Sequence, residues 1–316
     1  MVKSKIVVIG GTTASGKSDL ALELARKNDG IVINADSLQL YQGLPVLSAQ
    51  PTEDSRGLVE HKLYGIYSPY DRGNAFRWLQ DATEKIREAI EAEKLPIVVG
   101  GTGMYLSRLV SGVKEIPNVD LCLRKELNAM YDTLGWDKFY RIVQKVDPTG
   151  VSTVTYRNRQ RLIRLYEIYK ISGKKLSELE NIPNNSIFDR KNIFFVNVLP
   201  DRDIVYSRCE LRFRAFFENA TREVEKFTGK YPDISDGNYP ISYTIGFLEI
   251  KQYLSGRLSR EDAIDLAVKN TRHYAKRQYT WFRNQFNQVD FLLNYIPNKK
   301  DLNRLSEEIS FRILKT

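Results

Sequence analysis

The chain has 316 residues, a length that predicts about two domains, or one domain carrying an insertion. Its 42% hydrophobic and 28% charged residues exclude global disorder, and its two cysteines are too few for a disulfide scaffold. The formal net charge of +9 favours a polyanionic partner.

The sequence contains no run of about twenty apolar residues, which a membrane span would require. The apolar run over residues 6–9 leads into two glycines and shows no signal-peptide cleavage site. We therefore expect a soluble cytoplasmic protein with no membrane partner. Nothing in the sequence indicates an interface between copies, so we expect a monomer.

The beginning of the chain alternates short strands with helices. Continuous apolar runs rich in β-branched residues predict strands over residues 5–9, 31–33 and 95–99. Apolar residues at helical spacing predict helices over 17–27 and 78–93. Strands that alternate with helices imply a parallel sheet covered on both faces, which is the α/β fold class.

The strand pattern then disappears, and helical patterns cover 123–134, 136–146 and 158–172. We predict an all-helical insertion domain at residues 113–191, within a sheet-containing core formed by 1–112 and 192–316. A strand over 193–199 is expected to rejoin the sheet. The remainder is predicted to be mainly helical, with a last strand at 290–293, a terminal helix, and further helices over 204–227, 246–255 and 260–284.

The segment after the first strand fits the pattern G-x-x-x-x-G-K-[ST] at every fixed position. Its glycines allow a tight loop whose backbone N–H groups converge on phosphate oxygens, Lys17 adds a positive charge, and Ser18 can ligate Mg²⁺. With the predicted sheet, this indicates a P-loop NTPase-like core that binds a diphosphate or triphosphate. The expected phosphate-binding residues are Gly11, Thr12, Thr13, Ala14, Ser15, Gly16, Lys17 and Ser18.

Two further polar residues follow predicted strands: Asp36 after the second and Thr102 after the third. Ligands of open parallel sheets bind outside the carboxyl ends of the strands, so both residues should face the phosphate loop. Helix N-capping suits both residue types equally well, and position alone leaves the two roles open. The third strand ends in Gly-Gly-Thr rather than in the acidic residue typical of nucleotide hydrolases, which favours a polyphosphate held as a leaving group or donor.

The last long helix is strongly basic. Residues 266–289 contain no Asp or Glu, and their cations alternate with aromatic residues. A solvated helix face would show the same charges, but the mixture suits contact with a phosphate backbone and stacking on bases. The residues concerned are Lys269, Arg272, His273, Tyr274, Lys276, Arg277, Tyr279, Trp281, Phe282 and Arg283.

Two arginine clusters add to this picture. One opens a helix of the insertion, and with the basic C-terminal helix it suggests a clamp for a structured nucleic acid. The other follows the fourth strand, and at least one of its members should return to the phosphate loop. His61 and His273 lack ligand spacing, so we expect no metal site built on them. The clusters are Arg157, Arg159, Arg161 and Arg164, and Arg202, Arg208, Arg212 and Arg214.

Four runs outside the phosphate loop carry a family resemblance. They are Asp-Ser-Leu-Gln at 36–39, Gly-Gly-Thr-Gly-Met-Tyr-Leu at 100–106, Gln-Arg-Leu-Ile-Arg at 160–164 and Lys-Arg-Gln-Tyr-Thr-Trp-Phe-Arg at 276–283. None of these runs is common to phosphate-loop proteins in general. Over nearly its whole length, the chain resembles the bacterial tRNA dimethylallyltransferases, also called tRNA isopentenyltransferases.

This resemblance implies a reaction. A dimethylallyl group would move from dimethylallyl diphosphate to N6 of the adenosine 3′-adjacent to the tRNA anticodon, which gives N6-(dimethylallyl)adenosine and diphosphate. The phosphate loop would hold the donor diphosphate rather than ATP, with Mg²⁺ at Ser18. By the same resemblance, Asp36 is the general base, Thr102 contacts the oxygen that bridges carbon and phosphorus, and Arg212 also holds the diphosphate.

The resemblance also implies a tRNA-binding set, drawn from the insertion, the strand ends and the C-terminal helices. It comprises Asp36, Ser37, Leu38, Gln39, Thr102, Arg124, Gln160, Arg161, Leu162, Ile163, Arg164, Tyr243, Gly246, Lys276 and Arg277.

Two other function classes fit the phosphate loop. A small-molecule kinase would phosphorylate a metabolite with ATP, whereas a nucleotide-gated RNA-binding module would catalyse nothing. The kinase predicts tight ATP binding without dimethylallyl diphosphate binding, and the binding module predicts that Asp36→Ala changes no activity.

Overall fold

The computed structural model describes residues 5–113, 121–179, 184–234, 237, 239–286 and 288–315. It divides the chain into two compact units. One unit is formed by Met1–Val110 together with Ile187–Thr316, and the other is Ser111–Ser186. In the described part of the chain, no helix is long and apolar enough to cross a bilayer.

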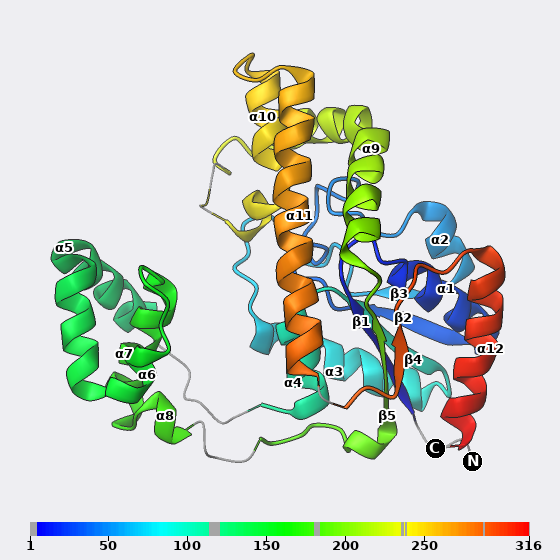
Figure 1. Ribbon diagram of the computed structural model, residues 1–316, viewed down its shortest axis with the longest axis horizontal. Coiled ribbons are helices and arrows are strands. Elements are labelled where there is room, and N and C mark those ends of the chain that lie inside the picture. The colour runs from blue at the N-terminus through cyan, green and yellow to red at the C-terminus, as the bar shows by residue number, and fades with distance from the viewer. Residues whose placement is uncertain are drawn as a thin grey trace. The chain divides into compact units, whose positions relative to one another are not determined.

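The first unit is built around a parallel sheet (Figure 1). Over the described residues the sheet has six strands in the order β3-β2-β4-β1-β5-β6. This confirms the predicted parallel α/β sheet, although β3 was not predicted because two residues are too few to show a hydrophobic pattern. The strands are β1 (Ile6–Gly11), β2 (Gly30–Asn34), β3 (His61–Lys62), β4 (Leu95–Gly100), β5 (Ile193–Val198) and β6 (Phe291–Leu293).

Helices cover both faces of this sheet. Every residue of β1, β2 and β5 is buried, which explains the continuous apolar runs in the sequence. The helices outside the insertion are α1 (Lys17–Lys27), α2 (Glu53–Leu58), α3 (Ala75–Glu91), α4 (Gly103–Ser111), α9 (Arg202–Lys230), α10 (Phe247–Leu254), α11 (Arg260–Gln285) and α12 (Lys299–Lys315), with 3-10 turns η1 (Arg190–Asn192) and η2 (Pro240–Tyr243).

The two faces of the sheet are covered by different parts of the chain. On one face, Leu24 of α1 and Ile309 of α12 belong to the same buried cluster as Ile9 of β1. On the other face, Phe282 of α11 stacks on Phe286, which in turn contacts Phe195 of β5. The basic helix α11 is therefore anchored in the core of the unit. Phe282, which we interpreted as a stacking residue for nucleic acid, is 1% exposed, so that interpretation is wrong.

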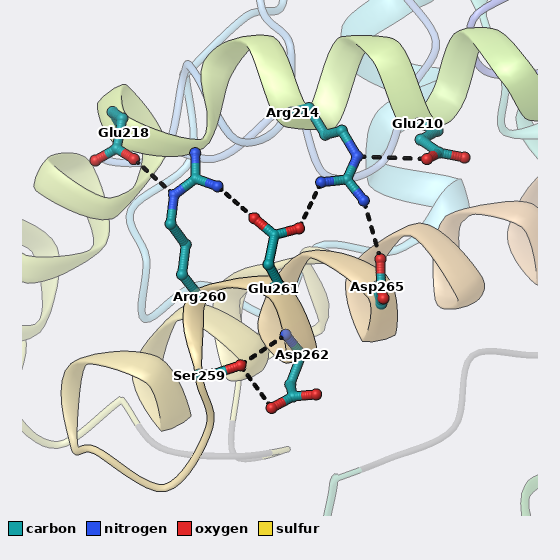
Figure 2. Close-up of polar contacts among 8 residues, drawn as sticks. All are labelled: Glu210, Arg214, Glu218, Ser259, Arg260, Glu261, Asp262 and Asp265. Atoms are coloured by element: carbon teal, nitrogen blue, oxygen red, sulfur yellow. Dashed lines mark hydrogen bonds and ion pairs between the residues drawn. The ribbon is translucent and has the colours of Figure 1, made fainter.

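The long helices α9 and α11 run side by side. Buried Ala275 of α11 packs with Val205 and Cys209 of α9. Exposed ion pairs from Arg214 to Glu261 and Asp265 and from Arg260 to Glu218 join the same two helices (Figure 2), and each such pair adds little stability on its own. Arg214 reaches Glu210, Glu261 and Asp265, and Arg260 reaches Glu218 and Glu261.

The regular elements of the second unit are helices over its described residues, which also contain an isolated antiparallel bridge between Val113 and Asn185. Its elements are α5 (Leu121–Val146), α6 (Pro148–Ser152), α7 (Arg159–Ser172) and α8 (Leu176–Leu179). The predicted break between the first two insertion helices occurs at Gly135, where φ is +71° inside α5. Buried Phe139 and Leu165 belong to its hydrophobic core.

Candidate active site

One cavity lies at the carboxyl ends of the strands and is lined by Asp36 and the phosphate loop, whereas Thr102 is not among its lining residues. The strands β2, β4 and β1 are adjacent in the sheet, and Asp36, Thr102 and the phosphate loop follow them in that order. The cavity has a volume of about 670 Å³. Its lining includes Asp36, Leu38, Gln39, Leu47, residues 13–19, and Arg208, Cys209, Arg212, Phe213, Phe216 and Tyr274 from α9 and α11.

The phosphate loop has the geometry expected of its glycines. Gly16 immediately precedes α1 and has a φ of +86°. A side chain at position 16 would strain the backbone at this φ. The Ser15 hydroxyl is buried in the cavity wall and has no hydrogen-bond partner among the described residues. A buried hydroxyl without a partner is costly, so Ser15 is suited to a phosphate oxygen.

Lys17 brings the main positive charge of the loop. Its ammonium donates a hydrogen bond of 3.0 Å to the carbonyl oxygen of Thr12. Burial lowers the pKa of Lys17 to about 8, and the nearby Asp36 carboxylate partly opposes this shift. An anionic ligand would favour the protonated form of Lys17 and thereby bind more tightly.

Asp36 is held by its neighbours in the chain. Its backbone N–H donates to the Asn34 side chain over 2.8 Å, and its carboxylate accepts the Leu38 N–H over 3.2 Å. Burial raises the pKa of the Asp36 carboxyl, whereas Lys17 and the backbone N–H groups act in the opposite direction. Asp36 thus bonds its own turn and faces the cavity, and because residues 37–40 form a turn rather than a helix, it is not a helix N-cap.

Thr102 lies directly behind this wall. Its hydroxyl accepts the Ser37 N–H over 3.0 Å and donates to the Ser37 hydroxyl over 3.4 Å. The backbones of the two strand ends are in close contact, since a Cβ atom at Gly100 would lie 2.1 Å from the carbonyl oxygen of Ala35. Only glycine at position 100 allows this approach.

The arginines that follow β5, which was the fourth strand predicted from the sequence, separate into two groups. Arg212 and Arg208 line the cavity, which confirms that at least one of them returns to the phosphate loop. Arg214 instead points to carboxylates of α9 and α11, as Figure 2 shows. Arg202 lies over the ring of Tyr279, 5.6 Å from its centre.

Two residues of α11 have roles at the site that the sequence did not predict. Gln278 of α11 is 5% exposed and hydrogen bonds to both the phosphate loop and Gly101. Tyr274 lies one helical turn before it and also faces the cavity. The four-residue spacing of these two side chains was a signal that the basic composition of the helix obscured.

The expected tRNA contacts lie in different environments. Leu162 and Ile163 are buried in the core of the insertion, and Gly246 is packed against Leu47 and Phe213. We therefore correct the prediction for the two side chains and for Gly246, because none of them is available at the surface. Gln39 lines the cavity, but its amide donates to the carbonyl oxygens of Ser48 and Ala49, so it supports the cavity wall.

The other expected tRNA contacts are exposed or partly exposed. Arg124 and Arg164 both pair with buried Glu167 of α7, and Arg159 pairs with Asp132, which compensates part of the basic cluster of the insertion. Lys276 and Arg277 are exposed on α11, and no ion pair engages either of them in the described part of the chain. Gln160, Arg161 and Tyr243 are also exposed.

The donor atoms suit a phosphate-bound metal ion. Among the described residues, no group of three or more His, Cys, Asp and Glu side chains could hold a metal ion. Ser18 and Asp19 are exposed at the cavity. Mg²⁺ commonly keeps several waters and binds one or two protein oxygens together with substrate phosphates, so these residues fit it.

Comparisons with known proteins identify relatives across the whole chain. A family model described as IPP transferase matches residues 39–285, and one described as isopentenyl transferase matches residues 4–66. The tRNA dimethylallyltransferase of Ehrlichia ruminantium is 34% identical over 303 residues, which cover 94% of this chain and 99% of that protein. That of Rickettsia bellii is 32% identical over 315 residues, covering 99% and 98%.

Solved structures agree with these relatives. The full-length tRNA isopentenylpyrophosphate transferase of Bacillus halodurans superposes with a TM-score of 0.68 at 29% identity, covering 99% of this chain and 98% of that one. A eukaryotic dimethylallyltransferase, described as acting on tRNA, superposes with a TM-score of 0.84 at 26% identity, covering 98% and 79%.

Proposed function

This chain belongs to the IPP transferase family of tRNA dimethylallyltransferases, and we propose how its cavity performs that family's reaction. The enzyme transfers a dimethylallyl group from dimethylallyl diphosphate to N6 of the adenosine 3′-adjacent to the anticodon. The N6–carbon bond forms as the carbon–oxygen bond to diphosphate breaks. The N6 proton goes to a base on the enzyme.

One observation carries this assignment: Asp36 lines the same cavity as Lys17 and Arg212. Two cations of the phosphate site therefore face a carboxylate that has no phosphate-binding role of its own. A diphosphate leaving group needs the cations, and an attacking amine needs the carboxylate.

The roles follow from charge and position. Lys17, Arg212 and the N–H groups of residues 11–18 neutralise the departing diphosphate. Thr102, beside Ser37, is assigned to the oxygen that bridges carbon and phosphorus. Asp36 accepts the N6 proton, and burial helps it because a raised pKa makes the carboxylate a stronger base. The allylic carbon shares its developing positive charge over the double bond, so leaving-group neutralisation and orientation supply most of the catalysis.

Mg²⁺ is the proposed cofactor. Ser18 would hold it, Asp19 of the same cavity lining would contribute through water, and the remaining ligands would be diphosphate oxygens and water. When bound, the ion adds positive charge to the leaving group.

The tRNA is proposed to bind through exposed charged and polar side chains. Lys276 and Arg277 on α11, and Gln160 and Arg161 in the insertion, are exposed in this structure. The target base must leave its stack to reach the cavity, and contacts with the anticodon loop offset that cost. Because the substrate is tRNA, we propose that the protein acts in the cytoplasm, as a monomer.

A direct assay tests the assignment. The full-length protein is incubated with dimethylallyl diphosphate, Mg²⁺ and an anticodon stem-loop carrying adenosine after the anticodon, and the digested nucleosides are analysed by mass spectrometry. We expect N6-(dimethylallyl)adenosine from the wild type and at least about a hundredfold less from Asp36→Ala. A protein that binds ATP tightly, ignores the allylic donor and makes no modified adenosine would instead be the kinase alternative.

A further inference from the structure

Gln278 is a buried polar residue on a helix whose other polar residues are mostly exposed. Its side-chain oxygen accepts the backbone N–H of Thr13 over 2.8 Å, and its side-chain nitrogen donates to the carbonyl oxygen of Gly101 over 2.8 Å. These partners belong to the phosphate loop and to the end of β4. One amide therefore joins the two segments that meet at the cavity.

The contact with Gly101 is unusually close. A Cβ atom at position 101 would lie 2.2 Å from the Gln278 side-chain nitrogen and 3.5 Å from the Asp36 carboxylate. The amide and the carboxylate thus surround the same point in space. A bulkier residue at position 101 would push the amide away from its carbonyl partner.

The contact with Thr13 has a second consequence. The Thr13 hydroxyl accepts a hydrogen bond of 2.9 Å from Arg212, while its N–H is held by Gln278. The side chain of Gln278 on α11 therefore fixes the backbone of Thr13, the residue to which Arg212 is bonded. Tyr274, one turn earlier on α11, lines the same cavity as Thr13 and Asp36.

We propose that Gln278 is a positioning residue that fixes the phosphate loop against the strand end carrying Thr102. It thereby holds the diphosphate leaving group and the Asp36 base at a fixed distance from each other. This inference rests on the proposed function. It assigns Gln278 a role inside the active site, whereas its neighbours Lys276 and Arg277 serve the exposed surface of α11. Displacing reacting groups by about 1 Å can lower turnover about a hundredfold, so a single amide at this junction has a large effect.

Only an amide satisfies both partners at once. A carboxylate accepts the Thr13 N–H but cannot donate to Gly101, whereas a methionine of similar length does neither. Gln278→Glu therefore removes only the hydrogen bond to Gly101, whereas Gln278→Met removes the hydrogen bonds to both Gly101 and Thr13. Glutamate also places a negative charge near Asp36, which raises the pKa of the base.

The experiment compares Gln278→Met, Gln278→Glu and the wild type in the stem-loop assay. We expect Gln278→Met to lower kcat about tenfold or more and to raise the KM for dimethylallyl diphosphate, with tRNA affinity within twofold of the wild type. For Gln278→Glu, we expect kcat to fall and the acid limb of its pH profile to move to higher pH, while the donor KM rises because the added carboxylate lies against the loop that holds the diphosphate. A residue that only supports folding would not move this limb.

Phe282→Leu is the matched control, because it loosens the buried side of the same helix without touching the cavity. It should lower Tm while leaving kcat near the wild-type value. The positioning role is overturned if Gln278→Met keeps kcat within about threefold of the wild type, or if Phe282→Leu loses as much. If Gln278→Met does not fold, an unshifted acid limb in Gln278→Glu overturns it. A wild type that makes no modified adenosine would refute the proposed function instead.

Discussion

The guanidinium of Arg212 donates a hydrogen bond of 2.9 Å to the hydroxyl of Thr13, a residue 199 positions earlier in the chain. Thr13 belongs to the phosphate loop and Arg212 to α9, which begins only after the helical insertion. The phosphate site is therefore completed by the second half of the chain. Lys17 alone does not make it.

Replacing Arg212 by alanine should weaken donor binding. Its guanidinium lines the cavity, and removing a charge that meets a buried ligand charge costs about 2 kcal/mol or more, or roughly thirtyfold in affinity. Titration calorimetry with dimethylallyl diphosphate and Mg²⁺ measures the change. Arg214→Ala is the control, because that arginine lies two residues along α9 and pairs with exposed carboxylates (Figure 2). Equal losses in the two variants would contradict the assignment.

Activity should fall on the acid side at an unusually high pH. Burial raises the pKa of Asp36 above its ordinary value of 3.8, and a proton acceptor works only when ionised. The rate is thus full above this raised pKa and is lost as the pH falls through it. A kcat profile over pH at saturating substrates measures the midpoint. The residual rate of Asp36→Asn should lack this limb, and a limb that persists there unchanged would assign it to another group.

Donor affinity should fall on the alkaline side. The free enzyme has a Lys17 pKa of about 8, and the diphosphate binds the protonated form. Affinity is therefore constant at lower pH and declines by up to about tenfold per pH unit above the pKa, because each binding event must then take up a proton. Measurements of donor Kd over pH test this. Lys17→Arg stays charged over the whole range and should show no decline from this residue.

Much of this site could be predicted from sequence because its parts are local. Lys17, Asp36 and Thr102 each follow a continuous apolar run, and parallel strands place such residues at one edge of a sheet. The strand β3 escaped prediction because it is only two residues long. Its position at the edge of the sheet is set by pairing with β2, which no local pattern records.

What sequence could not separate were residues with the same chemistry but different surroundings. Arg212 and Arg214 cannot be distinguished in the sequence. The packing of α9 on α11 places Arg212 in the cavity wall and Arg214 beside carboxylates. Phe282 and Tyr274 both lie in a basic, aromatic run, yet the first is core and the second lines the cavity. These differences depend on which face of a helix meets the sheet, and that is a property of tertiary structure.

Gly100 should be intolerant of a side chain. Its Cβ atom would meet the carbonyl oxygen of Ala35 at 2.1 Å, and backbone cannot rotate away as a side chain can. We expect Gly100→Ala to lower the free energy of unfolding by about 2 kcal/mol or more, measured by urea denaturation. Gly229→Ala is the control, because position 229 lies in α9 with open space around it, and alanine there should be neutral or stabilising by about 0.5 kcal/mol. A stable Gly100→Ala variant would show that the two strand ends can separate.

Lys276 and Arg277 should act on tRNA affinity and its salt dependence rather than on chemistry. Both are exposed on α11 between buried Ala275 and Gln278, so their charges face solvent while the helix stays anchored. Replacing either by alanine removes one phosphate contact, and the slope of log Kd against log salt should fall by about 1. Filter binding of the stem-loop at several salt concentrations measures the slope, with kcat at saturating tRNA close to the wild-type value. Arg260→Ala on the same helix should leave the slope unchanged, because Glu218 and Glu261 already neutralise that charge. A slope that changes equally in all three variants would indicate an effect of net charge rather than a binding surface at Lys276 and Arg277.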